Sequence, residues 1–169
     1  MPITDIPAEG REFSFADQSL WTGPAETFSM RLAVAEPLEA TLFVIPQKRG
    51  AYLRGRLSGT VVLPCDRCAA DARVEVDHDF EYVDELPEPG EAAEDTWLRE
   101  GKAGLELDAA GLLWEQFLLA LPTHVLCRPE CKGLCASCGA DLNVATCDCA
   151  PSGGDPRLAA LRGLKVGKK

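Results

Sequence analysis

The sequence predicts an α+β fold, in which an antiparallel strand-rich sheet or partial barrel packs against one buried helix. A zinc-knuckle segment and a short helix follow at the C-terminal end. Apolar and polar residues alternate over residues 51–63 and 74–82, as they do in half-buried strands. Residues 108–121 are apolar nearly all round a helix and should be buried. Six of the eight cysteines lie within residues 127–149, a density that favours bound metal.

The chain has 169 residues, and 46% of them are hydrophobic, which is enough for a real core. We expect a core domain over residues 1–122, with an acidic loop at 84–104. A cysteine-rich metal-binding segment should follow at 123–150. Residues 151–169 would form a linker and a short basic helix.

The beginning of the chain is predicted to form strands and loops. Residues 1–25 are weakly patterned and fit an edge strand with loops. Residues 28–34 alternate and predict a half-buried strand. Its apolar face would carry Phe28, Met30, Leu32 and Val34. A second apolar run, residues 41–45, stops at Pro46, and residues 47–50 suit a hairpin turn.

Residues 51–82 predict a long hairpin. The outgoing strand would place Leu53, Gly55, Leu57, Gly59, Val61 and Leu63 on one side. The glycines among them suggest bulges or a close approach of backbone. Cys65 and Cys68 form a C-x2-C motif at the tip. The returning strand would place Val74, Val76, His78, Phe80 and Tyr82 on one side and a solvated acidic face on the other. We expect His78 to be a satisfied core histidine rather than a ligand.

One helix is predicted after the hairpin. Residues 84–104 are acidic and rich in Pro, Ala and Gly, and we expect a mobile loop there. Residues 105–107 suit a short strand, and Asp108 can cap a helix that runs to about Leu121. This helix should be buried against the sheet or a partner.

A short helix is predicted to close the chain. Asp155 and Pro156 form a cap and first turn. The helix would carry Leu158, Leu161 and Leu164.

The cysteine cluster predicts a metal site. Its candidate ligands are Cys127, Cys131, Cys135, Cys138, Cys147 and Cys149. Residues 135–139, C-A-S-C-G, have the form of a zinc knuckle, in which the two-residue spacer directs both sulfurs to one ion. We expect Zn²⁺, although spacing alone does not separate zinc from iron.

Six cysteines exceed one tetrahedral site, and two assignments fit. In the first, one site holds Cys135, Cys138, Cys147 and Cys149, and a second holds Cys65, Cys68, Cys127 and Cys131. In the other, four cysteines of the cluster hold a single ion and the rest are spare. A closed four-thiolate site would be structural, because a catalytic zinc keeps an open position. Cys65 and Cys68 could instead be a redox pair or exposed thiols.

These motifs allow two further interpretations. His124, just before the cluster, could supply a ligand nitrogen. Cys131, Cys135 and Cys138 match the C-x3-C-x2-C spacing of radical-type iron–sulfur enzymes. We reject that interpretation, because little chain follows the motif and no alternating strand–helix pattern surrounds it.

The charge of the chain is unevenly distributed. The net charge is −10. Residues 74–98 include acidic residues but no Lys or Arg, whereas residues 157–169 include Lys and Arg but no acidic residue. Such a chain lacks the broad cationic face that binds free RNA or DNA. The N-terminus lacks the features of a signal peptide, and no run approaches the roughly 20 apolar residues of a membrane span. We expect the protein to be cytoplasmic, and in the cytoplasm clustered thiols hold metal more often than they form disulfides.

The sequence carries little that indicates an enzyme. It has no G-x-S-x-G, P-loop, G-x-G-x-x-G or H-E-x-x-H motif. The carboxylates between Glu75 and Glu94 fit a solvated face and loop. We therefore expect no enzymatic activity, and no small-molecule substrate is evident.

Four segments occur in a specific order. They are C-D-R-C at 65–68, a helix ending in L-L-A-L-P at 118–122, C-K-G-L-C-A-S-C-G-A-D-L-N at 131–143 and D-P-R-L-A-A-L-R-G-L-K at 155–165. Over about residues 61–165 the chain resembles the bacterial YceD family, of the cysteine-rich, zinc-binding kind. The resemblance implies a cytoplasmic protein that is needed for accumulation of large-subunit ribosomal RNA and acts in ribosome biogenesis. Some members of the family lack the cysteine cluster, which implies that the metal is scaffold rather than chemistry.

We therefore expect a non-enzymatic ribosome-biogenesis factor with a structural zinc, supporting synthesis or accumulation of large-subunit ribosomal RNA. Its acidic face would meet a basic protein such as a ribosomal protein, and the basic tail from Arg157 could contact pre-ribosomal RNA. Two alternatives stay open. One is a zinc-ribbon interaction module unrelated to ribosomes, and the other is a thiol- or metal-dependent enzyme that uses Cys65 and Cys68.

Overall fold

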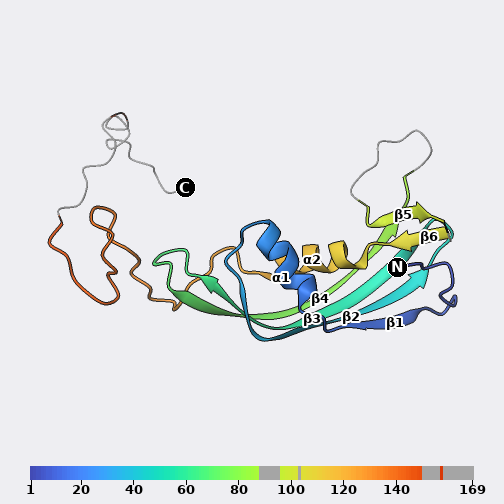
Figure 1. Cartoon of the computed structure of the whole chain (residues 1–169), viewed down its shortest axis with the longest axis horizontal. Helices are drawn as coiled ribbons and strands as arrows, with labels where there is room; N and C mark the ends of the chain where they lie inside the picture. The colour runs from blue at the N-terminus through green and yellow to red at the C-terminus, as the bar shows by residue number, and fades with distance from the viewer. Residues whose placement is uncertain (88–95, 103, 150–156, 158–169) are drawn as a thin grey trace, which may run out of the picture.

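An open, curved antiparallel sheet forms the body of the protein in the computed structural model, which describes residues 1–87, 96–102, 104–149 and 157 (Figure 1). The strands lie in chain order, β1 Arg11–Phe15, β2 Ala33–Pro46, β3 Gly50–Pro64 and β4 Asp71–Glu85. A separate two-stranded sheet pairs β5 Leu98–Gly101 with β6 Gly104–Leu107. Helices α1 Ser19–Thr27 and α2 Ala109–Ala120 cover one face of the large sheet. The α+β class and the antiparallel sheet are confirmed.

The predicted long hairpin is present as β3 and β4. Their register runs without a shift from the pair Gly50 and Glu85 to the pair Pro64 and Asp71. The side chains predicted to face the core are buried at Leu53, Leu57, Val61, Leu63, Val74, Val76 and Phe80. His78 is half-buried beneath α2, where its Nε2 lies 3.2 Å from Oε1 of Gln116. Its expected role as a satisfied core histidine agrees with this contact.

Two glycines of β3 allow close contacts, as predicted. A Cβ at Gly55 would collide with the ring of Phe80 on the neighbouring strand. Gly59 has a φ of +147°, and a Cβ there would lie 2.7 Å from the carbonyl oxygen of Pro37. Larger residues would force β2 and β4 away from β3 at these points.

The N-terminal prediction missed a helix. Residues 19–27 form α1, although Gly23 and Pro24 weaken its helical pattern. The helix buries Trp21 and Ala25, which lie one turn apart. Packing against the rest of the core therefore stabilises a segment whose own propensity is low.

The strand predicted at residues 28–34 is wrong over most of its length. Phe28 follows the end of α1, is 71% exposed and stacks on Trp114, with ring centroids 6.4 Å apart. The strand β2 begins only at Ala33 and then continues through Pro37 to Pro46. Its register with β3 shifts on either side of Glu36, and such irregularities accommodate a proline that cannot donate to the ladder.

The helix predicted after Asp108 is confirmed, but its predicted burial is only half right. The Asp108 side chain accepts a hydrogen bond from the Gly111 backbone N–H (3.1 Å), and the helix ends at Ala120. The sheet and α1 cover one face, which carries Ala109, Leu112, Leu113, Gln116 and Phe117. Leu118 and Leu119 are 43% and 65% exposed. A sheet can cover only one side of a helix that lies on it, so apolar residues on the other side stay in contact with solvent.

Strands occupy part of the segment predicted as a loop at 84–104. Strand β4 extends to Glu85, and β5 lies within the predicted loop. The backbone N–H of Trp97 donates to Oδ2 of Asp84 (2.9 Å), which ties the start of β5 to the end of β4. Residues 88–95 and 103 of this loop, and the predicted helix at 155–164 apart from residue 157, lie outside the described residues.

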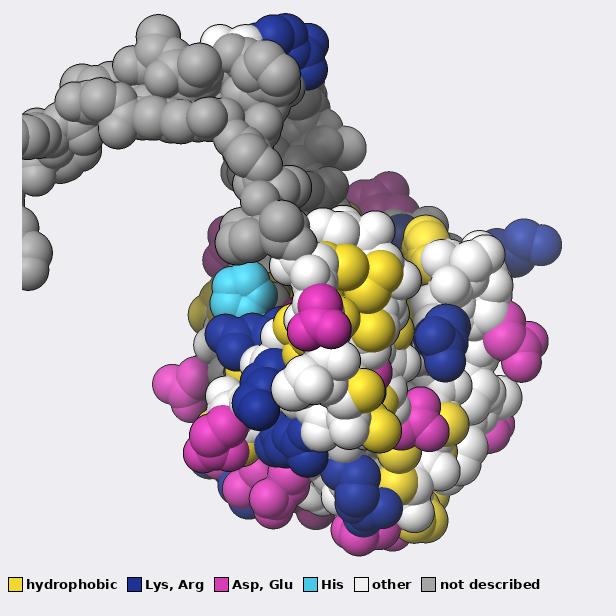
Figure 2. All heavy atoms as spheres, turned by 90° about the vertical axis from the view of Figure 1, so that its left-hand side faces the viewer, with side chains coloured by type: hydrophobic (Ala, Val, Ile, Leu, Met, Phe, Trp, Pro, Cys, Tyr) yellow, Lys and Arg dark blue, Asp and Glu magenta, His cyan; other side chains and the backbone are white. Residues whose placement is uncertain are grey.

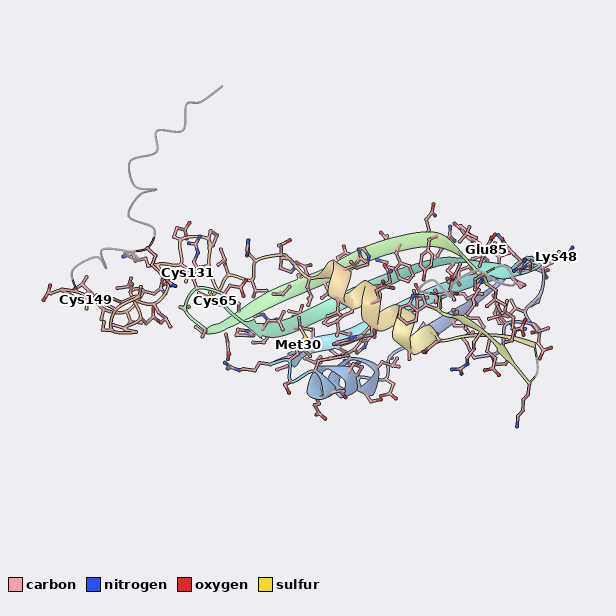
Figure 3. All side chains as sticks on the ribbon, turned by 90° about the horizontal axis from the view of Figure 1, so that it is seen from above. Met30, Lys48, Cys65, Glu85, Cys131 and Cys149 are labelled. Atoms are coloured by element: carbon pink, nitrogen blue, oxygen red, sulfur yellow. The ribbon has the colours of Figure 1, made fainter. Side chains whose placement is uncertain are left out.

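The chain after α2 returns to the tip of the hairpin. Figure 3 shows Cys65 beside Cys131 at one end of the sheet, with Cys149 beyond them. Lys48 and Glu85 lie at the opposite end. The fold thus brings the two C-x2-C motifs to the same end of the molecule. Across the described residues, no helix is long and apolar enough to cross a membrane.

Candidate metal centres

The eight cysteines gather in two groups of four, each of which could hold a metal ion. The hairpin group consists of Cys65, Cys68, Cys127 and Cys131. The knuckle group consists of Cys135, Cys138, Cys147 and Cys149. Within each group all sulfur atoms lie within 4.8 Å of one another. This grouping corresponds to the first of the two assignments, and it separates Cys131 from the pair with which it shares the C-x3-C-x2-C spacing.

The sulfur positions in the hairpin group suit a tetrahedral ion. Cys65 Sγ lies 3.8 Å from Cys131 Sγ, and Cys68 Sγ lies 3.6 Å from Cys127 Sγ. Four sulfurs at the usual Zn–S distance would be about 3.8 Å apart, whereas a disulfide would hold two of them at about 2 Å. Cys65, Cys68 and Cys131 are buried and Cys127 is half-buried. The group is therefore a closed set of soft ligands with little access for water.

The residues between Cys65 and Cys68 attach the hairpin tip to the returning chain. The Asp66 backbone N–H donates to the Val125 carbonyl (2.8 Å), and the Asp66 carboxylate accepts from the Val125 N–H (2.8 Å). Arg67 donates through Nη1 to the Cys131 carbonyl (2.8 Å), and its own carbonyl accepts from the Leu134 N–H (3.0 Å). These bonds place Cys127 and Cys131 opposite the tip cysteines.

The two C-x2-C turns share one hydrogen-bond pattern. In each, the first cysteine carbonyl accepts from the residue four positions on, from Ala69 (2.8 Å) in the hairpin and Gly139 (2.9 Å) in the knuckle. In each, the first cysteine N–H donates to the carbonyl five positions on, in Ala70 or Ala140, at 2.8 Å. The knuckle predicted from the sequence thus occurs twice in the fold.

The knuckle group is more open and more local than the hairpin group. Cys138 and Cys149 are exposed, and Cys135 and Cys147 are half-buried. Its ligands come from residues 135–149 alone, whereas the hairpin group joins two parts of the chain that lie far apart in sequence. An ion in the knuckle group would therefore stabilise a local loop, whereas an ion in the hairpin group would join two distant parts of the chain.

The thiols of the hairpin group differ in acidity. Burial raises the pKa of Cys65, but the backbone N–H groups of Cys127, Arg67 and Cys68 outweigh it and bring the pKa to about 6. Burial and the neighbouring sulfurs of Cys68 and Cys131 raise the pKa of Cys127 to about 12. Like charges this close cannot all form unless a cation joins them. A divalent ion would therefore favour the fully ionised set.

The knuckle group follows the same rule. The backbone N–H groups of Cys138 and Ser137 lower the pKa of Cys135 to about 6, and the Ser137 N–H lies 3.4 Å from its sulfur. Interaction with the sulfurs of Cys138 and Cys135 raises the pKa of Cys149 to about 12. In both groups one sulfur is ready to bind a cation and another must lose its proton first.

The histidine weighed as a ligand is not part of either group. His124 has a side chain that is 82% exposed, and its Nδ1 lies 3.9 Å from the Asp66 carboxylate. The sequence reasoning missed a different contact, because Asn143 donates through Nδ2 to Cys131 Sγ at 3.4 Å. An asparagine in a loop carries no pattern that would have identified it.

The cysteine end of the molecule carries charges of both signs. Figure 2 shows Lys and Arg side chains gathered along one side of this end, with Asp and Glu side chains close to them. In this view the end is not a broad cationic surface of the kind that binds a polyanion through many contacts.

The chain is similar to known proteins over most of its length. The family model described as "Large ribosomal RNA subunit accumulation protein YceD" matches residues 53–165, which include the hairpin, α2 and all eight cysteines. A Zea mays protein named "Large ribosomal RNA subunit accumulation protein YCED homolog 1, chloroplastic" is 32% identical over 85 residues, covering 50% of this chain and 24% of its own. The Arabidopsis thaliana protein of the same name is 24% identical over 156 residues, covering 76% of this chain and 49% of its own. The chain thus spans at most about half the length of these relatives. No solved structure matches the chain.

Proposed function

The chain belongs to the YceD family of large ribosomal RNA subunit accumulation proteins, and on this basis we propose that it is a non-enzymatic ribosome-biogenesis factor. It supports the synthesis or accumulation of large-subunit ribosomal RNA. The observation that carries this proposal is the family match over residues 53–165, which covers most of the hairpin, α2 and both cysteine groups. We place the protein in the cytoplasm, where reduced thiols persist.

We propose further that the chain binds two Zn²⁺ ions, one in each cysteine group. All eight predicted ligands would be used, Cys65, Cys68, Cys127 and Cys131 for one ion and Cys135, Cys138, Cys147 and Cys149 for the other. Four thiolates close the coordination sphere and leave no position for a reacting water, so the role of each ion is structural. Each could contribute roughly 10–16 kcal/mol to folding of its segment. Elemental analysis of the purified protein distinguishes zinc from iron.

The proposed division of the chain follows the sequence prediction, and the hairpin ion adds a link between two of its parts. The core over residues 1–122 and the cysteine-rich segment 123–150 are joined by the hairpin ion, because Cys65 and Cys68 belong to the first and Cys127 and Cys131 to the second. Residues 151–169, which apart from residue 157 lie outside the described residues, are the proposed linker and basic tail. The hairpin ion would thus fix the cysteine-rich segment to the core.

An enzymatic role for the hairpin cysteines is disfavoured by their burial. A catalytic thiolate needs an accessible sulfur with a lowered pKa. Cys65 has a pKa of about 6, but its residue is only 3% exposed. Its low pKa suits a metal ligand, which has to be deprotonated to bind.

The proposed partner is a basic protein, such as a ribosomal protein. The exposed face of β4 presents the carboxylates of Glu75, Asp77, Asp79 and Glu81. Arg56 pairs with Asp77 and Asp79, so part of this charge is balanced within the sheet. Pre-ribosomal RNA could still be contacted through the basic residues after Arg157. Affinity purification at rising salt tests the choice, and recovery of RNA alone at high salt would contradict a protein partner.

Deletion of the gene tests the proposed function. We expect the ratio of large-subunit to small-subunit ribosomal RNA to fall in the deletion strain and to recover when the full chain is restored. Normal ribosome profiles and normal ribosomal RNA levels would instead favour an interaction module unrelated to ribosomes. Restoring a chain with Cys65→Ser and Cys68→Ser then shows whether the hairpin ion is needed for this function.

A further inference from the structure

One side chain connects the two cysteine groups. Asn143 lies between Cys138 and Cys147, within the segment that the knuckle group encloses. Its amide nevertheless points back to the hairpin group, where Nδ2 donates to Cys131 Sγ at 3.4 Å. Its Oδ1 accepts from the backbone N–H of Lys132 at 2.8 Å. A residue in the loop of the knuckle group thus donates a hydrogen bond to a ligand of the hairpin group.

The backbone around Asn143 makes the same connection. The Leu142 N–H donates to the Gly133 carbonyl (3.0 Å), and Leu134 forms an antiparallel bridge with Asp141. On the other side, the Leu134 N–H donates to the Arg67 carbonyl at the hairpin tip (3.0 Å). The residues that link Cys131 to Cys135 are therefore held between the hairpin tip and the loop of Asn143.

The orientation of Asn143 is set within its own loop. Oδ1 of Asp141 accepts from the Asn143 backbone N–H (2.9 Å) and from its Nδ2 (2.7 Å). This loop has little core of its own: Asp141, Leu142 and Asn143 are half-buried, and Val144 is 85% exposed. An ion held by Cys135, Cys138, Cys147 and Cys149 would close the loop at both ends and so fix the direction of the Asn143 amide.

We propose that Asn143 couples the two metal sites, so that an ion in the knuckle group raises the affinity of the hairpin group, and the reverse. This inference rests on the proposed binding of two ions. The N–H···S bond stabilises the Cys131 thiolate and orients it toward the ion, in the way that outer partners orient metal ligands. Linkage requires that the effect is reciprocal. Loss of such a partner typically lowers metal affinity by about 10-fold to 100-fold.

Cobalt titration of the full chain, reduced and freed of metal, measures the coupling. Co²⁺ occupies thiolate sites of this kind and reports on them through its sulfur-to-metal charge-transfer bands. Cys135→Ser with Cys138→Ser removes the knuckle site and isolates the hairpin site. We expect the hairpin site in this variant to bind Co²⁺ about 10-fold or more weakly than in the unchanged chain.

Substitutions of Asn143 test its part in the coupling. Asn143→Asp keeps the oxygen that accepts from Lys132 and removes the N–H donor, and Asn143→Ala removes both without adding charge. We expect both variants to weaken the hairpin site to the level seen without the knuckle site, and removal of the knuckle cysteines should then cause no further loss. The charge-transfer band of the hairpin ion should move to lower energy, because an unbonded thiolate donates charge more readily. Val144→Ala, at the adjacent exposed position, is the control and should behave as the unchanged chain.

The outcomes separate this inference from the proposal on which it depends. Two bound ions with equal hairpin affinity in all these variants would overturn the coupling and leave two-ion binding intact. Two ions with weakened binding but an unshifted band would also overturn it, since that result indicates a general loss of stability. Binding of a single ion by the unchanged chain would contradict two-ion binding itself, and the coupling with it.

Discussion

Ala69 and Gly139 occupy the same position in two C-x2-C turns, and both have a positive φ, 57° and 73°. Each directly follows the second cysteine of its turn and donates its backbone N–H to the carbonyl of the first. A left-handed conformation costs an L-residue roughly 1–2 kcal/mol, and glycine avoids most of that cost. The hairpin turn therefore contains strain that the knuckle turn avoids.

Exchanging these residues should have opposite effects. Gly139→Ala should destabilise the knuckle site by about 1 kcal/mol, from backbone strain alone, because no atom lies within 4 Å of a Cβ placed there. Ala69→Gly should stabilise the hairpin turn by a smaller amount, since glycine also loses more entropy on folding. Chelator competition at each site measures both effects. A destabilising Ala69→Gly would show that the strain is compensated elsewhere.

Metal content should follow the two groups. The unchanged chain should bind two Zn²⁺, and removal of either C-x2-C pair, by Cys65→Ser with Cys68→Ser or by Cys135→Ser with Cys138→Ser, should leave one. A chelator should remove the knuckle ion first, since Cys138 and Cys149 are exposed whereas three of the hairpin cysteines are buried. Mass spectrometry of the native protein gives the counts.

Ser137→Ala is the matched control for these losses. Ser137 contacts Cys135 through its backbone N–H, so the substitution should leave both ions bound. One ion in the unchanged chain, still present after Cys65 and Cys68 become Ser, would rule out the two-site assignment.

Zinc binding should release fewer than four protons per ion at pH 7.5. Cys65 and Cys135, each with a pKa of about 6, are already ionised at that pH, whereas Cys127 and Cys149, each with a pKa of about 12, must lose a proton. Calorimetry in buffers of different ionisation enthalpy gives the proton count. Release of four protons per ion would mean that the metal-free chain does not hold the arrangement of N–H donors that lowers the pKa of Cys65 and Cys135.

The stability of the metal-free fold should rise with pH, because of the same lowered pKa values. The pKa of Cys65 and Cys135 lies below the ordinary value of 9.0. Their contribution to stability is therefore complete above about pH 9 and is lost as the pH falls through about 6. Urea unfolding of the chelated protein between pH 5 and 9 should show a midpoint that rises with pH. A midpoint that falls over this range would contradict the lowered pKa values.

The contact between the helices should dominate the stability of the core. Trp21 of α1 and Phe117 of α2 are fully buried, with ring centroids 5.7 Å apart. Phe117→Ala should lower the free energy of unfolding by about 3–5 kcal/mol, through lost burial and the cavity it leaves. Leu119→Ala, two positions away but 65% exposed, should change it by about 0.5 kcal/mol or less. Equal losses in the two variants would mean that the exposed side of α2 is covered in solution.

Patterns that depend on neighbouring residues were predictable. The alternation of residues 51–63 and 74–82 identified the hairpin and its buried side, because successive side chains of a strand face opposite ways. Asp108 identified the start of α2, because its side chain satisfies a backbone N–H three residues on. The C-x2-C spacing identified both turns for the same kind of reason.

Features that depend on distant contacts were not predictable from these patterns. The helix α1 buries Trp21 against Phe117 across the core, a contact that no local pattern indicates. Spacing also left two ways of grouping the cysteines. The fold gathers them four and four by placing the hairpin tip against residues 125–134 through the bonds of Asp66 and Arg67. The side chain of Asn143 likewise reaches Cys131 only once the loop has folded back. Local hydrogen-bond geometry is encoded by residue type and spacing, whereas the partners of a sulfur or an amide depend on where the whole chain brings them.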